Sequence, residues 1–175
     1  MPNTSDLSII KPTKLDTLRR LKIQDSPYES LFNTITRAIS EICDMPIAFI
    51  SFIEEDRQWF KSKIGLDGIS ETPIEHAFCA YTILSTETMI VRDATRDERF
   101  KDNPLVTGET NIRFYAGAPI TLPLGERIGS LSVIDTKANE LDDYKIAALE
   151  GFAKVISQSL LIRDIHSRAS HVDPT

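Results

Sequence analysis

Strict alternation along Arg113–Ile120 constrains this chain more than any other feature, because a β-strand presents successive side chains to opposite faces. One face of this predicted strand contains Phe114, Ala116, Ala118 and Ile120, and the other contains Arg113, Tyr115, Gly117 and Pro119. The first face is apolar and suits close packing against a helix. The second combines a guanidinium, a phenol and a gap at Gly117, which favours the lining of a small pocket; alternatively, its polar residues only cap the sheet edge. Pro119 lacks an N–H donor, so strand pairing should loosen there.

A second pair of strands is predicted near the N-terminal third of the chain. Ile47–Ile53 and Gln58–Ile64 form a hairpin whose turn is the charged cluster Glu54–Arg57. Both faces of the first of these strands are apolar, so each face must be covered by other elements.

The remaining elements follow from apolar spacing, caps and breakers. We expect a helix around Leu15–Leu21, a second helix from the capping box Ser26–Glu29 to Cys43, a loop over Gly65–Pro73, a short helix within His76–Leu84, a strand at Met89–Arg92, a helical turn near Asn103–Thr107, a return strand at Arg127–Asp135, and a last helix capped by Asp142. This order predicts an α+β fold with a central antiparallel sheet of five or six strands. The N- and C-terminal helices should share one face, with the short helix and loops over a pocket on the other.

The last helix carries two apolar stripes. Its core stripe consists of Leu149, Phe152, Ala153, Ile156 and Leu160, and a second stripe of Ala148, Val155, Ile162 and Ala169 recurs every seven residues. The second stripe favours contact with a partner helix in a homodimer. A wide single face toward the protein's own core is the alternative.

The length of 175 residues and the composition indicate one domain with short appendages. We expect a flexible segment over residues 1–12, the domain over residues 13–166, and a flexible tail over residues 167–175. A net charge of −6 without a basic run excludes a nucleic-acid partner, and neither a membrane-spanning run nor a signal peptide is visible. The two cysteines, Cys43 and Cys79, lie in apolar surroundings, which indicates reduced thiols and a cytoplasmic location.

Several short segments, taken in order, resemble the GAF family of small-molecule sensor domains. They are Asp56–Lys61, Ala77–Ala80, Val91–Ala94, Asp97–Phe100 with Asn103–Val106, Ile112–Pro119, and Gly129–Asp135. The resemblance runs from about Leu15 to Ile165 and is strongest to GAF domains of bacterial signalling proteins, which often precede histidine kinase or diguanylate cyclase modules. It implies a PAS-related fold with a pocket on one sheet face and terminal helices at a dimer surface.

The same resemblance argues against three specialised GAF chemistries. Cys79 is followed by Ala80 rather than histidine, so bilin attachment is not expected. Two cysteines fall short of the cluster used by enzymes that reduce free methionine sulfoxide. The signature of cyclic-nucleotide GAF domains is absent as a set. No cofactor is expected, and no metal, because His76 is the sole histidine near the predicted pocket.

The predicted ligand site combines apolar walls and polar groups. The walls are Trp59, Phe78, Cys79 and Tyr115, and the polar groups are Asp93, Arg99, Arg113 and Asp135. An arginine in such a site suits a carboxylate or phosphate. In the alternative interpretation, Trp59 belongs to the core and the charges form ion pairs beneath the charged loop.

The sequence therefore favours a non-catalytic sensor that couples an unknown small-molecule ligand to a helical dimer or to a downstream kinase or cyclase module. Two other functions stay open. One is a structural dimerisation module without a ligand. The other is a redox enzyme acting through Cys79, which would require a thiolate at neutral pH.

Overall fold

The computed structural model describes residues 29–169. Its centre is an antiparallel six-stranded sheet with strand order β3-β2-β1-β6-β5-β4. The strands are β1 (Ile47–Glu54), β2 (Arg57–Ile64), β3 (Glu71–Pro73), β4 (Met89–Val91), β5 (Phe114–Thr121) and β6 (Arg127–Asp135). The predicted hairpins and the α+β class are confirmed. The loop predicted over Gly65–Pro73 is wrong at its end, because Glu71–Pro73 pairs with β2 as a short edge strand.

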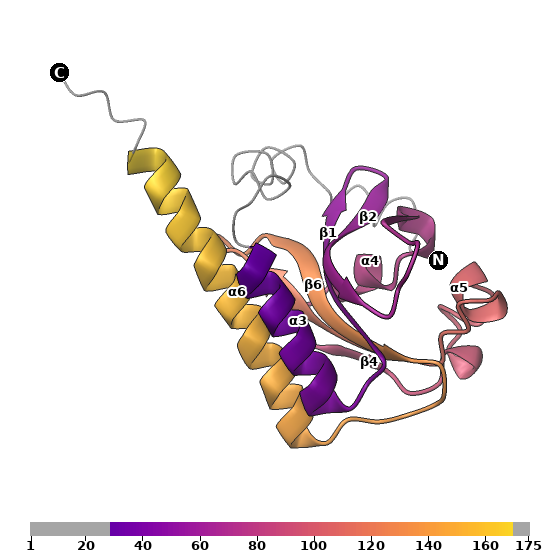
Figure 1. Cartoon of the computed structure of the whole chain (residues 1–175). Helices are drawn as coiled ribbons and strands as arrows, with labels where there is room; N and C mark the ends of the chain where they lie inside the picture. The colour runs from indigo at the N-terminus through magenta and orange to yellow at the C-terminus, as the bar shows by residue number, and fades with distance from the viewer. Residues whose placement is uncertain (1–28, 170–175) are drawn as a thin grey trace.

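Helices cover both faces of the sheet (Figure 1). They are α3 (Glu29–Cys43), α4 (Phe78–Thr82), α5 (Pro104–Thr107) and α6 (Asp143–Ala169), with single 3₁₀ turns η2 (Ile74–His76) and η3 (Ala94–Arg96). Helices α3 and α6 lie side by side on one face, α4 and α5 lie on the other, and the C-terminal part of α6 extends beyond the body of the domain. The predicted helix at Leu15–Leu21, the residues Ser26–Tyr28 of the capping box, and the predicted segment 1–12 lie outside the described residues.

Local capping explains where α5 and α6 begin. The Oδ1 atom of Asp142 accepts a hydrogen bond from the backbone N–H of Lys145 at 2.9 Å, as a residue before the first helical turn does. Asn103 accepts from the backbone N–H of Leu105 at 2.9 Å, and Pro104 follows at the first helical position. Helix α6 continues to Ala169, past the expected domain boundary at residue 166.

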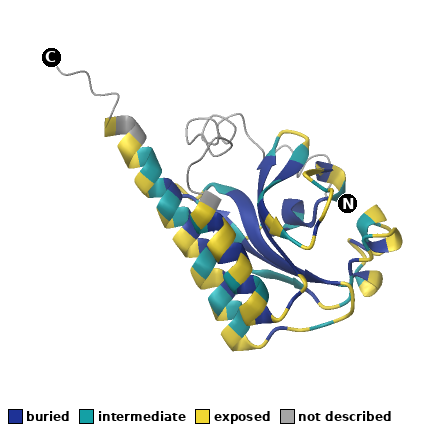
Figure 2. Ribbon diagram, viewed as in Figure 1, coloured by how far each residue is buried: buried dark blue, intermediate teal, exposed yellow. Residues whose placement is uncertain are grey.

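The two faces of β5 separate as the alternation predicts. Its apolar face belongs to the core that α3 and α6 cover, with Phe114, Ala116, Ala118 and Ile120 all buried there. Tyr115 belongs to a second core on the opposite face, together with Phe78 and Phe100. Figure 2 shows the sheet as the most deeply buried layer between the two sets of helices.

Strand pairing loosens next to Pro119 on one side of β5 only. The pairing of β4 with β5 ends at Met89 and Gly117, before Pro119 is reached. The pairing of β5 with β6 continues past the proline to Thr121 and Arg127. The outer edge of β5 is therefore left open beyond Gly117.

Among the described residues, no helix has the length and apolar character required to cross a membrane.

Candidate functional site

Aromatic side chains fill the sheet face on which Tyr115 lies. The ring of Phe78, from α4, stacks on Phe100 with centroids 4.1 Å apart, and it lies 5.1 Å from the ring of Tyr115. The space that remains nearby is a cavity of about 20 Å³ lined by residues that include Phe49, Phe60 and Phe78. Such a volume holds about one water molecule. The expected hollow beside Tyr115 is therefore closed in this structure, because the phenol turns back over Gly117 and α4 packs on top of it.

The hydroxyl of Tyr115 is the centre of a buried polar network beneath α4. Its oxygen is 2.8 Å from Thr82 Oγ1 on α4 and 3.0 Å from Ser132 Oγ on β6. Ser132 Oγ is in turn 2.8 Å from Ser130 Oγ. A helix on one side of the network and two strands on the other are thus joined through hydroxyl groups that water does not reach.

The network continues across the sheet to β2. The thiol of Cys79 is hydrogen bonded to Ser130 and Ser51, and Gln58 Nε2 donates to Ser51 Oγ at 2.8 Å. We call this set the buried polar network; its members are Ser51, Gln58, Cys79, Thr82, Tyr115, Ser130 and Ser132. All of them are buried, and the hydrogen bonds offset the cost of removing these polar groups from water.

Burial also sets the protonation of the network. Burial raises the pKa of the Cys79 thiol from 9.0 to about 11, and the hydrogen bonds from Ser130 and Ser51 oppose that shift only in part. The pKa of Tyr115 is raised as well, chiefly by burial and then by the neighbouring thiol. Both groups are therefore neutral at physiological pH, and the thiol is not a nucleophile there.

Trp59, predicted as a wall of the pocket, lies on the opposite face of the sheet. It is buried among residues that α3 covers, and its ring lies 5.3 Å from that of Phe52. The reason is the hairpin register, which places Trp59 directly opposite Phe52. Counting outward from the turn at Glu55 and Asp56 would have placed both residues on the same face.

Two of the predicted polar groups have partners within their own loop. Asp93 accepts hydrogen bonds from the backbone N–H and the hydroxyl of Thr95, which lowers the pKa of its carboxyl. Arg99 donates to both carboxylate oxygens of Asp97, at 2.9 and 2.7 Å, and lowers the pKa of that carboxyl. The Arg99 guanidinium also lies 5.1 Å from the centre of the Phe100 ring.

The other two predicted polar groups lie where β5 begins and β6 ends, and they bind neighbouring segments there. Arg113 donates to the carbonyl of Val106 at 2.9 Å and to Asn111 Oδ1 at 2.7 Å. The Oδ2 atom of Asp135 accepts from Asn139 at 3.0 Å. The structure thus brings Phe78, Cys79 and Tyr115 together, but it does not direct the four predicted charged groups to that point.

Of the network, Cys79 and Tyr115 were predicted as site residues, whereas Gln58, Thr82 and the three serines were missed, although a signal for the serines exists. Ser130 and Ser132 occupy alternate positions in β6. The neighbouring residues Leu131 and Val133 point to the other face and belong to the core beneath α3 and α6. Ser51 stands in the same way among apolar residues of β1. Hydroxyls at inward positions of otherwise apolar strands are unusual in a core and indicate a polar contact on that face.

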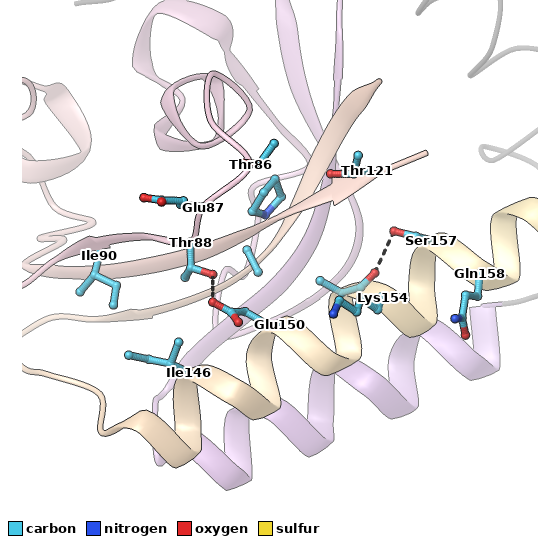
Figure 3. A pocket seen from close by; sticks show the side chains of 13 residues that line it. Thr86, Glu87, Thr88, Ile90, Thr121, Ile146, Glu150, Lys154, Ser157 and Gln158 are labelled. Carbon is cyan, nitrogen blue, oxygen red and sulfur yellow. Dashed lines mark hydrogen bonds between the residues drawn. The ribbon is translucent and has the colours of Figure 1, made fainter. Parts of the chain in front are cut away.

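A larger concavity lies on the sheet face that α3 and α6 cover, at the β4–β5 edge. This groove has a volume of about 720 Å³ and runs between α6 and the open edge of β5 (Figure 3). Its floor is apolar, with Ile90, Ala118 and Ala153, and its rim is polar. Thr88 and Glu150 face each other across the groove and are joined by a hydrogen bond of 2.8 Å. No residue of the groove was predicted as a site.

Within residues 29–169, no three histidine, cysteine, aspartate or glutamate side chains lie close enough together to hold a metal ion.

Comparison with known proteins identifies the family of this chain and a relative of similar sequence. A family model described as GAF domain matches residues 27–160. A cyclic di-GMP phosphodiesterase of Pseudomonas aeruginosa is 44% identical over 138 residues, which cover 78% of this chain and 23% of the relative. This chain therefore spans about a quarter of the length of that protein.

Solved structures share the fold at low sequence identity. The GAF domain of an Acinetobacter phosphoenolpyruvate-protein phosphotransferase superposes with a TM-score of 0.62 at 17% identity, covering 91% of this chain and 98% of that one. A type II free methionine-R-sulfoxide reductase from Thermoplasma acidophilum gives 0.63 at 13% identity, covering 75% and 91%. These likenesses concern the fold alone, which carries both regulatory domains and enzymes.

Proposed function

Because the chain belongs to the GAF domain family, we propose that it is a non-catalytic sensor domain of a bacterial signalling protein. In this proposal a small polar molecule binds beneath α4, and the resulting change reaches a neighbouring module through α6. The observation that carries the proposal is the buried polar network, which lies between α4 and the sheet.

The chemistry of the network supports a polar ligand. Seven polar side chains occupy a region that apolar side chains could fill without any desolvation cost. If α4 moves away, the hydroxyls of Thr82 and Tyr115 lose each other as partners, and the Tyr115 hydroxyl, which still contacts Ser132, becomes available to a ligand. Hydroxyl groups both donate and accept, so sugars, nucleosides and hydroxy acids match this surface in chemical class.

The small size of α4 supports its role as the element that opens. It has five residues, and Ala77 before it provides no side-chain cap. Short helices without caps have little stability of their own and depend on tertiary packing. The cost of opening α4 is therefore mainly the burial of Phe78 and the network bonds, which a ligand can replace.

The sequence relative supports a signalling context. Its name assigns that protein a phosphodiesterase activity on cyclic di-GMP, and this chain matches about a quarter of it. We propose that this domain regulates such an output, with histidine kinases and diguanylate cyclases as other candidate output modules. The raised pKa of the Cys79 thiol supports a domain without thiol chemistry of its own.

The proposal is tested by native mass spectrometry of the purified protein, followed by a melting screen against hydroxyl-bearing metabolites. A ligand at about 100 times its Kd adds roughly 2.7 kcal/mol to the free energy of unfolding. Ser132→Ala should abolish that increase, because Ser132 contacts both Tyr115 and Ser130. Tyr144→Phe is a matched control, since Tyr144 is 89% exposed on α6. If no copurified mass and no melting shift appear across the screen, the ligand-binding part of the proposal is lost.

A second candidate function is dimerisation without a ligand. The observation that favours it is the second stripe of α6, where Val155 is 42% exposed and Ile162 is 53% exposed. Ile165 on the same helix is 57% exposed. Exposed branched side chains at heptad spacing favour a coiled contact with another helix. Sensor and dimer are compatible, because a ligand regulates a dimer whenever it binds one helix arrangement better than another.

A further inference from the structure

The segment between α4 and β4 connects the two layers of the domain. Helix α4 ends at Thr82 on the sheet face that carries the polar network, and β4 begins at Met89 on the edge of the sheet. Thr88, the last residue before β4, donates through Oγ1 to Glu150 Oε1 on α6, on the other face. A chain of six residues, 83–88, therefore joins the element over the network to the long C-terminal helix.

The first part of this segment is held tightly to the sheet. Arg127, at the start of β6, donates through Nε to the carbonyl of Ile83 at 2.5 Å and through Nη2 to that of Leu84 at 3.5 Å. These two carbonyls follow the last turn of α4, where a cation is favourable. A displacement of α4 therefore has to stretch or break these two hydrogen bonds before it reaches Thr88.

The groove leaves α6 room to respond. On the side of α6 that faces the β4–β5 edge, the groove of about 720 Å³ lies between the helix and the strand residues around Pro119. Close-packed interfaces resist small shifts, whereas a flank without packing does not. In this region the Thr88–Glu150 hydrogen bond spans the gap between the sheet edge and the middle of the helix.

We infer that the Thr88–Glu150 hydrogen bond is a contact through which α4 and α6 influence each other, beside their shared packing on β5 and β6. The regulatory meaning of this contact rests on the proposed function, but the coupling itself does not require a ligand. Coupling between two sites is reciprocal, so loosening the contact from the α6 side must also be felt at α4. Thr88 and Glu150 are positioning residues in this account, because neither contacts the buried polar network.

Amide hydrogen exchange measured by mass spectrometry on the full chain tests the inference. Glu150→Ala changes only α6, yet it should raise the exchange rate in peptides covering residues 78–85 by about fivefold, as expected for the loss of one net hydrogen bond. Thr88→Val should raise that rate by a similar factor, and the double variant no further, because both changes remove the same bond. Thr88→Ser keeps a hydroxyl and should restore the protection found in the wild type.

Thr86→Val is the matched control, because Thr86 lines the same groove from the same segment but lies on the far side of Glu87 from Thr88. It should leave exchange in residues 78–85 unchanged. Wild-type exchange there in Glu150→Ala would overturn the inference, and so would equal effects of Thr86→Val and Thr88→Val. The outcome is independent of the ligand screen. If Glu150→Ala raises exchange in residues 78–85 but no metabolite shifts the melting temperature, the coupling holds and the sensor proposal fails. If a metabolite shifts the melting temperature but Glu150→Ala leaves exchange unchanged, the sensor proposal holds and the coupling fails.

Discussion

The phenol of Tyr115 occupies the space directly above the backbone of Gly117. A Cβ atom at Gly117 would lie 2.2 Å from the Tyr115 hydroxyl oxygen and 2.7 Å from Cζ of the same ring. The gap that the sequence places at Gly117 is therefore real, and the side chain two residues earlier in the strand fills it. This relationship turns a potential pocket wall into a closed core.

Gly117→Ala should lower the free energy of unfolding by about 2–3 kcal/mol, because the new methyl group displaces the ring of Tyr115 and breaks its hydrogen bonds to Thr82 and Ser132. Urea denaturation measures the change. Gly151→Ala on α6 is the matched control, since a Cβ there meets nothing within 4 Å. That substitution should stabilise the helix by roughly 0.5–1 kcal/mol, so two identical changes should have opposite signs.

Tyr115→Phe should destabilise the domain by about 1–2 kcal/mol, because removal of the hydroxyl leaves Thr82 Oγ1 and Ser132 Oγ without that partner in the core. The exposed Tyr144 provides the comparison, and Tyr144→Phe should change stability by less than about 0.5 kcal/mol. Equal unfolding midpoints for the two variants would show that the buried polar network contributes nothing.

The raised pKa of Cys79 predicts a loss of stability at alkaline pH. The unfolded thiol ionises near its ordinary value of 9.0, while the folded thiol keeps its proton until about pH 11. Between these values the unfolded chain binds fewer protons than the native one, so stability falls as pH rises. By about pH 10.5 the thiol should account for a loss of about 2 kcal/mol.

Cys79→Ala isolates that contribution. The variant is less stable than the wild type near neutral pH, because a buried group is removed. The difference between the two proteins should shrink as the pH is raised from about 8 to about 10.5. Parallel curves in denaturation experiments across this range would contradict the assignment, because Cys43 and the other titrating groups are common to both proteins.

Trp59→Ala should cost roughly 3–5 kcal/mol in stability, as the loss of a large buried core side chain does. Trp59→Phe retains most of the buried area and should cost far less. Because Trp59 lies across the sheet from the buried polar network, any melting shift caused by a ligand should keep its size in Trp59→Phe. If the ligand no longer shifts the melting temperature of Trp59→Phe, Trp59 contributes to the ligand site after all.

Val155→Glu or Ile162→Glu should separate a dimer without unfolding the domain, because both side chains are about half exposed on α6. Sedimentation analysis measures the oligomeric state, and circular dichroism checks the fold. Lys154→Glu introduces a similar charge on the groove side of the same helix and serves as the control. If the dimer persists in both variants, the second apolar stripe of α6 is not the dimer interface.

The arrangement of strands and helices was largely predictable because its signals are local. The alternation in β5 predicts which side chains meet α3 and α6, and Asp142 predicts the start of α6. The site was predictable only in part. Phe78, Cys79 and Tyr115 do meet, whereas Arg99 pairs with Asp97 two residues away and Arg113 binds the carbonyl of Val106 in α5.

The sequence by itself determined the two faces of the sheet, because the period of a strand is fixed by its backbone and needs no other part of the chain. Only the tertiary structure decided whether the face of Tyr115 is open or closed. That outcome depends on how Phe78, Phe100 and the phenol share one volume, although they come from distant segments. Distances between such segments are set by packing of the whole domain, which alternation and caps do not encode.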